Sequence, residues 1–391
     1  MQLLEINRRS QIVFYEMHND ARLLLSMREY KNDLGRAKSK KHRPNELDAK
    51  VGEIRREVIC QGPAFQNKLL KGNGMQDLIS IEDLSRGEIE NLFSTVDHLR
   101  HTPDVFRHAL AGRVVCTLFF EPSTRTRLGF EAAAHRLGAR VLSVSDMRNT
   151  RLERGESLLD TTRMVGFYCD VVVARHVEDG VMHRIKETVR VPLINAGEGQ
   201  VRHPSQTLID LYTLQEHFGA IDNLHVGIAG GIRYSRAAKS LIAGLRKFSN
   251  IRLHLVDAAQ EMDEGTEFPR ELGELNGVPA LEYSSMKEMI GHVDVVYVVR
   301  VQQEKFTDPA AYQRQLNKCR LHRALLSRAS PSLVVMHCLP RADELDTDID
   351  DTPQNKYFQQ ARHGVAVRSA VLLRCLDADS GRGAFGRGKS W

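Results

Sequence analysis

The residues best suited to chemistry lie in one short segment that follows an apolar run. It reads Phe119-Phe120-Glu121-Pro122-Ser123-Thr124-Arg125-Thr126-Arg127. The Glu-Pro pair predicts the end of a strand, and Ser123 is placed to begin a helix as its N-cap residue. Free backbone N–H groups at that helix terminus, three hydroxyl groups and the Arg125 side chain would converge on one point, which suits a phosphate or another small anion. An ordinary capped helix with exposed arginines is the alternative that the same residues allow.

Other polar motifs follow apolar runs further along the chain. They are Arg175-His176, His203-Pro204-Ser205-Gln206-Thr207, Tyr234-Ser235-Arg236, Arg300-Val301-Gln302 and His337-Cys338-Leu339-Pro340-Arg341. Taken alone, a histidine before a proline such as His203 is more often a structural helix cap than a catalytic group. The turn at 226–231 contains glycines but does not match the G-x-G-x-x-G spacing of nucleotide-binding dehydrogenases, which disfavours that class.

The elements that must position these motifs alternate between strand and helix. Apolar runs of strand length occur at 114–120, 171–173, 226–229, 253–256, 293–299 and 333–336. Ser85 and Glu88 form a capping box at the start of a helix, a longer helix is predicted from about 206 to 218, and a last one from about 368 to 376. The pattern predicts an α/β fold with two doubly wound, parallel-sheet domains joined by a central helix.

The first part of the chain has a different character. Residues 1–74 carry apolar residues at helical spacing in two stretches, separated by a basic linker, and they end at Lys71-Gly72-Asn73-Gly74. These features predict an N-terminal helical extension, through which a further protein could bind. The glycine-rich end, 378–391, is expected to be a flexible tail.

Composition narrows the class of protein. The net charge is +5, but the only clear basic run, 38–43, has no interleaved aromatic residues, so a solvated linker is favoured over a nucleic-acid site. No apolar run is long enough to cross a membrane, and the first residues lack the apolar core of a signal peptide. The six cysteines are scattered and show no zinc-binding spacing. We expect a cytoplasmic protein without a structural metal, a membrane anchor or a nucleic-acid partner.

The motifs, taken in order, resemble those of the aspartate and ornithine carbamoyltransferase superfamily. The resemblance covers about residues 75–377. Within the superfamily, the sequence is most similar to the catalytic chain of the aspartate branch. It implies a carbamoyl-phosphate-binding domain at 75–206, completed by a C-terminal helix at 358–377, and an amino-acid-binding domain at 207–357. It also implies homotrimers whose active sites are shared between neighbouring subunits.

The resemblance further implies a role for each matching residue. The phosphate would be held by Ser123, Thr124, Arg125 and Thr126. The carbamoyl oxygen would accept hydrogen bonds from Thr126, Arg175 and His203, and the carbamoyl NH₂ would donate to Gln206 and to carbonyls around Leu339 and Pro340. Arg236 would bind the α-carboxylate of the amino acid, and Arg300 with Gln302 its side-chain carboxylate. No cofactor is required, because the departing phosphate can accept the proton of the attacking amine.

Two arginines suit two carboxylates, which favours aspartate over ornithine, although His337-Cys338-Leu339-Pro340 looks more like the ornithine branch. Arg154 stands where the family has a lysine in a mobile loop, and Gly230-Gly231 stands where it commonly has an acidic residue. The expected activity is carbamoyl transfer to aspartate or a similar acidic amino acid. A paralogue of secondary metabolism with another amine or acyl phosphate, or a non-catalytic scaffold, remains the alternative.

Overall fold

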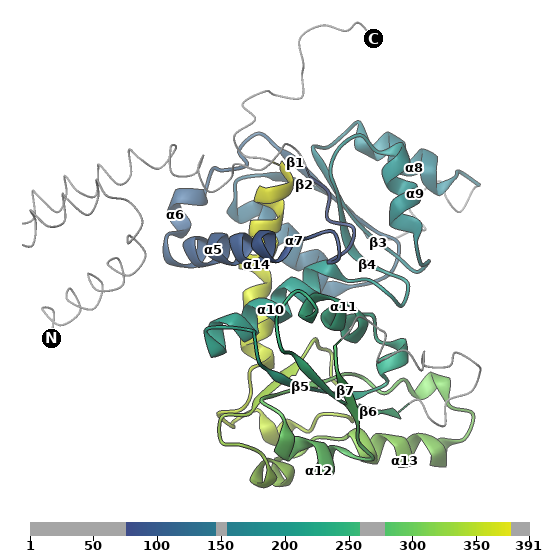
Figure 1. Cartoon of the computed structure of the whole chain (residues 1–391). Helices are drawn as coiled ribbons and strands as arrows, with labels where there is room; N and C mark the ends of the chain where they lie inside the picture. The colour runs from purple at the N-terminus through teal and green to yellow at the C-terminus, as the bar shows by residue number, and fades with distance from the viewer. Residues whose placement is uncertain (1–75, 146–154, 259–277, 377–391) are drawn as a thin grey trace, which may run out of the picture. The chain divides into compact units, whose positions relative to one another are not determined.

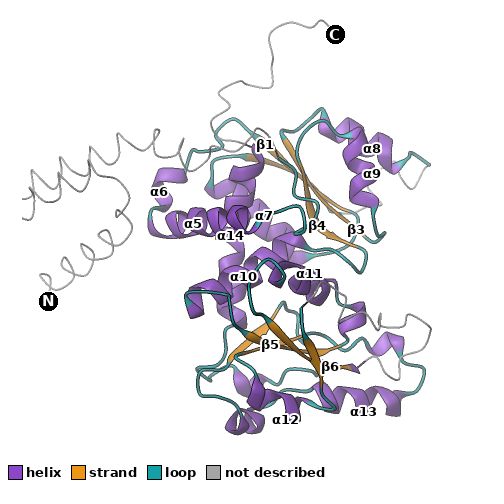
Figure 2. Ribbon diagram, viewed as in Figure 1, coloured by secondary structure: helices purple, strands orange, loops and turns teal. Residues whose placement is uncertain are grey.

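The computed structural model describes residues 76–145, 155–258 and 278–376. The predicted N-terminal extension, the residues around Arg154 and the predicted tail lie outside these ranges. Within the described residues, no helix has the length and apolar character needed to span a membrane. Two parallel sheets, each covered by helices, make up the described residues, which confirms the predicted α/β class (Figures 1 and 2).

The first sheet has four strands in the order β2-β1-β3-β4. The strands are β1 (Val114–Phe119), β2 (Arg140–Val144), β3 (Val171–His176) and β4 (Leu193–Glu198). β1 and β3 are central and almost wholly buried, as their continuous apolar residues require, whereas β2 forms an edge and is largely exposed. The accompanying helices are α5 (Arg86–His101), α6 (Pro103–Phe106), α7 (Thr124–Arg136), α8 (Leu158–Gly166) and α9 (Val181–Thr188).

The second sheet has five strands in the order β7-β6-β5-β8-β9, all parallel. They are β5 (His225–Gly230), β6 (Arg252–Asp257), β7 (Ala280–Glu282), β8 (Val295–Val298) and β9 (Val334–His337). The helices of this domain are α11 (Arg236–Leu245), α12 (Met286–Met289) and α13 (Pro309–Cys319). Short 3₁₀ turns, among them Ile232–Tyr234 and Gln303–Lys305, connect the strands to these helices.

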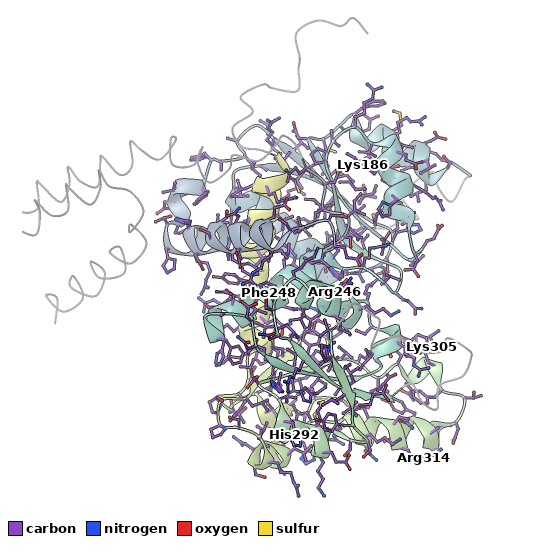
Figure 3. All side chains as sticks on the ribbon, in the orientation of Figure 1. Lys186, Arg246, Phe248, His292, Lys305 and Arg314 are labelled. Carbon is purple, nitrogen blue, oxygen red and sulfur yellow. The ribbon has the colours of Figure 1, made fainter. Side chains whose placement is uncertain are left out.

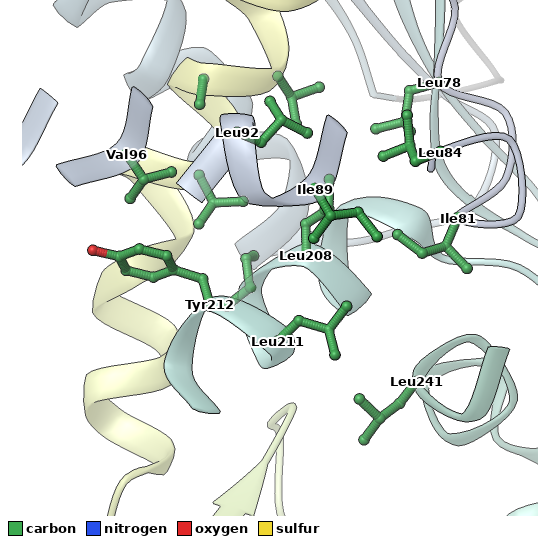
Figure 4. Packing of buried hydrophobic residues seen from close by; sticks show 14 of the residues in the cluster. Leu78, Ile81, Leu84, Ile89, Leu92, Val96, Leu208, Leu211, Tyr212 and Leu241 are labelled. Carbon is green, nitrogen blue, oxygen red and sulfur yellow. The ribbon is translucent and has the colours of Figure 1, made fainter. Parts of the chain in front are cut away.

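Two long helices connect the domains. α10 (Pro204–Phe218) begins with a proline in its first turn and ends at Gly219, which has a left-handed backbone with φ of 78°. α14 (Tyr357–Leu376) packs against α10, α5 and α7, and also contacts β9 (Figure 1). Leu208, Leu211 and Tyr212 of α10 meet apolar residues of α5 in one continuous core (Figure 4).

The capping box at Ser85 is present, and the predicted strands and central helix are confirmed within one to three residues. The last helix begins at Tyr357 rather than near Arg368, because its first half buries Gln360 and His363, which do not form an apolar stripe. The sequence patterns do not reveal β2 and β7, which are exposed edge strands, or β4, whose polar Asn195 and Glu198 are fully buried.

Candidate active site

The predicted site residues lie at the carboxyl ends of strands. In each sheet the strand order reverses once, between β1 and β3 in the first and between β5 and β8 in the second. Arg175 lies near the end of β3, the segments after β1, β5 and β8 carry Ser123 to Thr126, Arg236 and Arg300, and the segment after β9 carries Leu339 and Pro340. Such reversals leave a crevice at the strand ends where α/β proteins bind ligands.

The N-terminus of α7 has no side-chain cap. Ser123 is in the N-cap position with an extended backbone (φ −157°, ψ 104°), but its side chain makes no capping hydrogen bond to the described residues. Ser85, Ser157 and Ser235 cap α5, α8 and α11 with their side chains, whereas Ser285 at the start of α12 does not. The N–H groups at the start of α7 therefore remain directed at an incoming group, which an anion at a helix N-terminus would use. Thr126 is buried in this first turn.

Arg175 and His203 meet at Gly197. A Cβ added to Gly197 would lie 2.8 Å from Arg175 Nη1 and 3.3 Å from His203 Cδ2, so only glycine leaves room for both side chains. The backbone of Gly197, with φ of 117°, is also in a region that glycine adopts most easily. Arg175 Nη1 donates to the carbonyl of Ala196 at 3.2 Å. The site thus has two buried donor groups side by side.

Burial decides the charge of these two groups. Burial, with Arg175 and Arg236 nearby, holds the pKa of His203 well below its usual value, so the imidazole is neutral at pH 7. Burial and the charge of Arg236 lower the pKa of Arg175 to about 10, which still leaves it charged. Ser205 Oγ lies 3.4 Å from His203 Nδ1. If the Ser205 hydroxyl donates a hydrogen bond to Nδ1, the imidazole N–H is on Nε2, where it can donate to a substrate oxygen.

Glu121 connects Arg175 with Arg236 and was not predicted as a site residue. Its Oε1 accepts from Arg175 Nη2 at 2.9 Å and from Arg236 Nη2 at 2.6 Å, and its Oε2 accepts from Arg236 Nη1 at 2.8 Å. These two arginines hold the pKa of Glu121 below its usual value despite its partial burial. A carboxylate directly before the anion-binding segment was the available sequence signal. The ion pairs bring the two domains together at the site.

The second domain supplies the remaining predicted residues. Arg300 is half exposed and pairs with Glu304 at 2.8 Å. Gln302 lies against Gly231, since a Cβ at Gly231 would be only 2.0 Å from Gln302 Oε1. That Oε1 atom is buried and has no hydrogen-bond partner among the described residues. Lys305, labelled in Figure 3, has its Nζ 5.1 Å from the centroid of the Tyr234 ring. Tyr234 precedes Arg236 by two residues.

Gln206 and the Leu339-Pro340 pair lie at the junction of the domains. Gln206 is in the first turn of α10, and its Nε2 donates to Asp210 at 2.7 Å. The Leu339-Pro340 peptide bond is cis, and the N–H of Leu339 donates to His337 Nδ1 at 2.8 Å. Among the described residues, no three His, Cys, Asp or Glu side chains are grouped so that they could hold a metal ion.

Sequence comparison matches both domains to one family. Residues 76–216 match the carbamoyl-P binding domain of aspartate/ornithine carbamoyltransferases, and residues 222–375 match their Asp/Orn binding domain. The aspartate carbamoyltransferase catalytic subunit of Thermofilum pendens is 40% identical over 301 residues, which cover 77% of this chain and 95% of that protein. The Methanocaldococcus jannaschii subunit is 36% identical over 309 residues, or 78% of this chain and 100% of that protein. The chain belongs to the aspartate/ornithine carbamoyltransferase family.

Solved carbamoyltransferase structures have the same fold. The catalytic subunit of M. jannaschii aspartate transcarbamoylase has a TM-score of 0.72 at 34% identity, covering 79% of this chain and 100% of that one. The Trypanosoma cruzi aspartate transcarbamoylase in complex with carbamoyl phosphate and aspartate has a TM-score of 0.72 at 28% identity, covering 79% and 99%. The family resemblance of the sequence motifs is therefore confirmed.

One predicted carbamoyltransferase residue, Arg154, lies outside the described residues. The other predicted residues lie at the strand ends or, for His203 and Gln206, at the start of α10. Those linked by contacts are Arg175 with His203, through Gly197, and Arg175 with Arg236, through Glu121. Arg125 and Arg300 are more exposed than this central group, which suits residues that meet a ligand from the solvent side.

Proposed function

We propose that this protein transfers the carbamoyl group of carbamoyl phosphate to the α-amine of L-aspartate and releases phosphate. The observation that carries the proposal is the pairing of charged Arg175 and neutral His203 beside the N-terminus of α7. That arrangement offers donors for a carbonyl oxygen next to donors for a phosphate, which is what an acyl phosphate requires. A scaffold would have no use for this buried donor pair, and the relatives named above are all aspartate enzymes.

In this mechanism, the protein acts by positioning and by electrostatics. Ser123, Thr124, Arg125 and Thr126 bind the phosphate, while Thr126, Arg175 and His203 donate to the carbamoyl oxygen. The amine nitrogen attacks the carbonyl carbon, and the same donors stabilise the oxyanion that forms. The bond from carbon to the phosphate oxygen then breaks, and the departing phosphate accepts the amine proton.

The acceptor binds on the side of the second domain. Arg236 takes the α-carboxylate, and Arg300 with Gln302 takes the side-chain carboxylate. Because Arg236 donates to Glu121 through both terminal nitrogens, the incoming carboxylate must exchange with part of that ion pair. Arg300 has the more exposed guanidinium, so its pairing with Glu304 is the weaker one to replace.

The test is an assay of the full chain with carbamoyl phosphate and a panel of amines that includes aspartate, ornithine and glutamate. Phosphate release and the mass of the carbamoylated product are measured together. We expect carbamoylaspartate as the main product, and loss of turnover by two or more orders of magnitude in His203→Ala. Product with another amine only, or none at all, would overturn the proposed acceptor or the proposed chemistry.

We also propose that the protein is a homotrimer with shared active sites, in which Arg154 enters the site of the neighbouring subunit. Apolar side chains exposed at the end of α8, shortly after Arg154 in the sequence, support a subunit contact: Phe167 is 68% and Tyr168 58% exposed. Light scattering should give three chains per particle. Mixing inactive His203→Ala and Arg154→Ala subunits should restore part of the activity, whereas no recovery in verified hybrids would exclude sharing.

A further inference from the structure

A buried carboxylate lies behind Gln206. Asp210, one turn further along α10, has no exposed surface. Its Oδ1 accepts from Gln206 Nε2 at 2.7 Å and from Gln360 Nε2 at 2.6 Å. Its Oδ2 accepts from the hydroxyl of Tyr297 at 2.9 Å. Because Gln360 belongs to α14 and Tyr297 to β8, Asp210 joins the central helix to elements of both domains.

These bonds fix the orientation of two side-chain amides. Oδ1 of Asp210 accepts hydrogen bonds both when the group is ionised and when its proton is on Oδ2, so both glutamines must turn their NH₂ groups toward it. For Gln206, this leaves the carbonyl oxygen Oε1 as the atom available to a ligand. For Gln360, Oε1 accepts from the backbone N–H of His337 at 2.9 Å. Each amide therefore has one allowed orientation.

The second amide extends the effect to the Leu339-Pro340 segment. His337 Nδ1 accepts from the N–H of Leu339, so the ring N–H is on Nε2, which donates to Glu344 at 3.0 Å. The segment that carries the Leu339 and Pro340 carbonyls is thus tied through His337 and Gln360 to Asp210. One carboxylate orders every group to which the proposed function assigns the carbamoyl NH₂.

We propose that Asp210 is a positioning residue that makes the site select a carbamoyl group over other acyl groups. The proposal rests on the proposed function, since it concerns the acceptors of the carbamoyl NH₂. Acetyl phosphate offers a methyl group in place of NH₂ and would leave Gln206 Oε1 and the carbonyls unpaired, which a desolvated site disfavours. Without Asp210, the Gln206 amide can rotate and present its own NH₂, so the preference falls.

The experiment compares two acyl donors in the full-length enzyme. With acetyl phosphate, the aspartate amine attacks the acetyl carbon, the bond to the phosphate oxygen breaks, and phosphate leaves with the amine proton to give N-acetylaspartate. The measured quantity is kcat/KM for carbamoyl phosphate divided by kcat/KM for acetyl phosphate. If acetyl transfer is too slow, the inhibition constant of acetyl phosphate divided by the KM of carbamoyl phosphate replaces it.

Two substitutions separate the loss of the acceptor from the loss of the charge. Asp210→Leu removes the acceptor, and we expect the ratio to fall about tenfold or more. Asp210→Asn keeps an oxygen toward the two glutamines and can turn its NH₂ toward the Tyr297 oxygen, so we expect a ratio within threefold of the wild type. Equal ratios in wild type and Asp210→Leu would overturn the proposal.

Tyr297→Phe is the matched structural control. It removes a buried partner of Asp210 but leaves the bond to Gln206 in place, so the ratio should hold even if the melting temperature falls. A drop as large as in Asp210→Leu would mean that general loosening, not the Gln206 amide, sets selectivity. If Asp210→Leu does not fold, Asp210→Ser serves, because its hydroxyl can bond to the carbonyl one turn back in the helix and is too short to hold Gln206.

A double substitution tests whether Asp210 acts through Gln206. In a Gln206→Leu background, replacement of Asp210 by leucine should change the ratio little further, whereas a full additional loss would contradict the coupling. The wild-type reaction separates the two proposals. If the wild type makes no carbamoylaspartate, the proposed function fails; if it does and the variants keep its selectivity, only the role of Asp210 fails.

Discussion

The Glu121 side chain forms ion pairs with two arginines, Arg175 and Arg236. It compensates the buried charge of Arg175, and it holds Arg236, which belongs to the other domain. Without it, two guanidinium groups would face each other in a partly desolvated place. Its contribution therefore combines stability with the geometry of the acceptor site.

Glu121→Gln should weaken both properties. Glutamine keeps the shape but cannot accept from two arginines with a full charge, so we expect unfolding free energy to fall by about 1–3 kcal/mol and kcat/KM for aspartate by about tenfold or more. Urea denaturation and steady-state kinetics provide the two readouts. Glu131→Gln is the control, because Glu131 is a half-buried partner of Arg127, Thr117 and Ser143. It should lose stability but retain kcat/KM; equal kinetic losses would contradict a special role for Glu121.

Gly231, which stands where the family commonly has an acidic residue, leaves space for the side chain of Gln302. Any Cβ there would be 2.0 Å from Gln302 Oε1 and 3.1 Å from the carbonyl of Arg300. Gly231→Ala must therefore displace Gln302, and we expect the KM for aspartate to rise about tenfold with a smaller change in kcat. Gly87→Ala, at a position with open space around it, should leave both constants unchanged. An unaltered KM in Gly231→Ala would show that Gln302 does not contact the acceptor.

At the scale of elements, sequence patterns predict what apolar periodicity controls. The buried strands, the Ser85 cap and the amphipathic central helix follow from it, and so does the meeting of polar motifs at the strand ends. The patterns do not reveal β4, because its buried polar residues interrupt the apolar run and are satisfied partly by distant groups such as the carbonyl of Ile79, to which Asn195 donates at 2.8 Å. Glu121 and Asp210 stay hidden for a similar reason, since both arginine partners of Glu121, and Gln360 and Tyr297 among the partners of Asp210, come from other elements.

α10 shows that such a buried polar group affects stability as well as the site. Burial raises the pKa of Asp210 from 3.8 to about 7, against the opposing effect of its hydrogen bonds and of Arg368. Folded Asp210 therefore keeps its proton up to a higher pH than unfolded Asp210 and is ionised above about pH 7. Stability from this group is complete below its unfolded pKa and is lost as the pH rises through about 7. Gln206, Gln360, Tyr297 and, through Tyr297, Cys338 complete its surroundings.

Asp210→Asn should remove this dependence on pH. The unfolding free energy of the variant minus that of the wild type should be about 2–3 kcal/mol larger at pH 8 than at pH 5, because asparagine has no charge to desolvate. The variant is thus stabilised relative to the wild type as the pH rises. Denaturation at both values gives the comparison, and Asp222→Asn provides a control at a partly exposed carboxylate whose pKa is lowered by Arg86. A difference that is the same at both pH values would mean that Asp210 does not titrate as its burial requires.

At the scale of the whole molecule, the family fold accounts for residues 76–216 and 222–375. The relative from Methanocaldococcus jannaschii aligns over its full length with 78% of this chain. Residues 1–74 are therefore additional to what the family needs for its fold. A chain that begins at residue 75 should keep its kcat within about twofold, because every described site contact lies after that residue. The truncated chain also retains Arg154.

The same truncation separates catalysis from assembly. If residues 1–74 bind another protein or connect trimers, light scattering should show fewer chains per particle for the truncated chain. Phosphate release with aspartate should be unchanged. A bisubstrate phosphonate at saturation should raise the melting temperature of both chains by several degrees, since a ligand that binds only the folded state stabilises it. Loss of both activity and this shift in the truncated chain would show that the segment takes part in folding the transferase, and an extension outside the family fold would then be the wrong description.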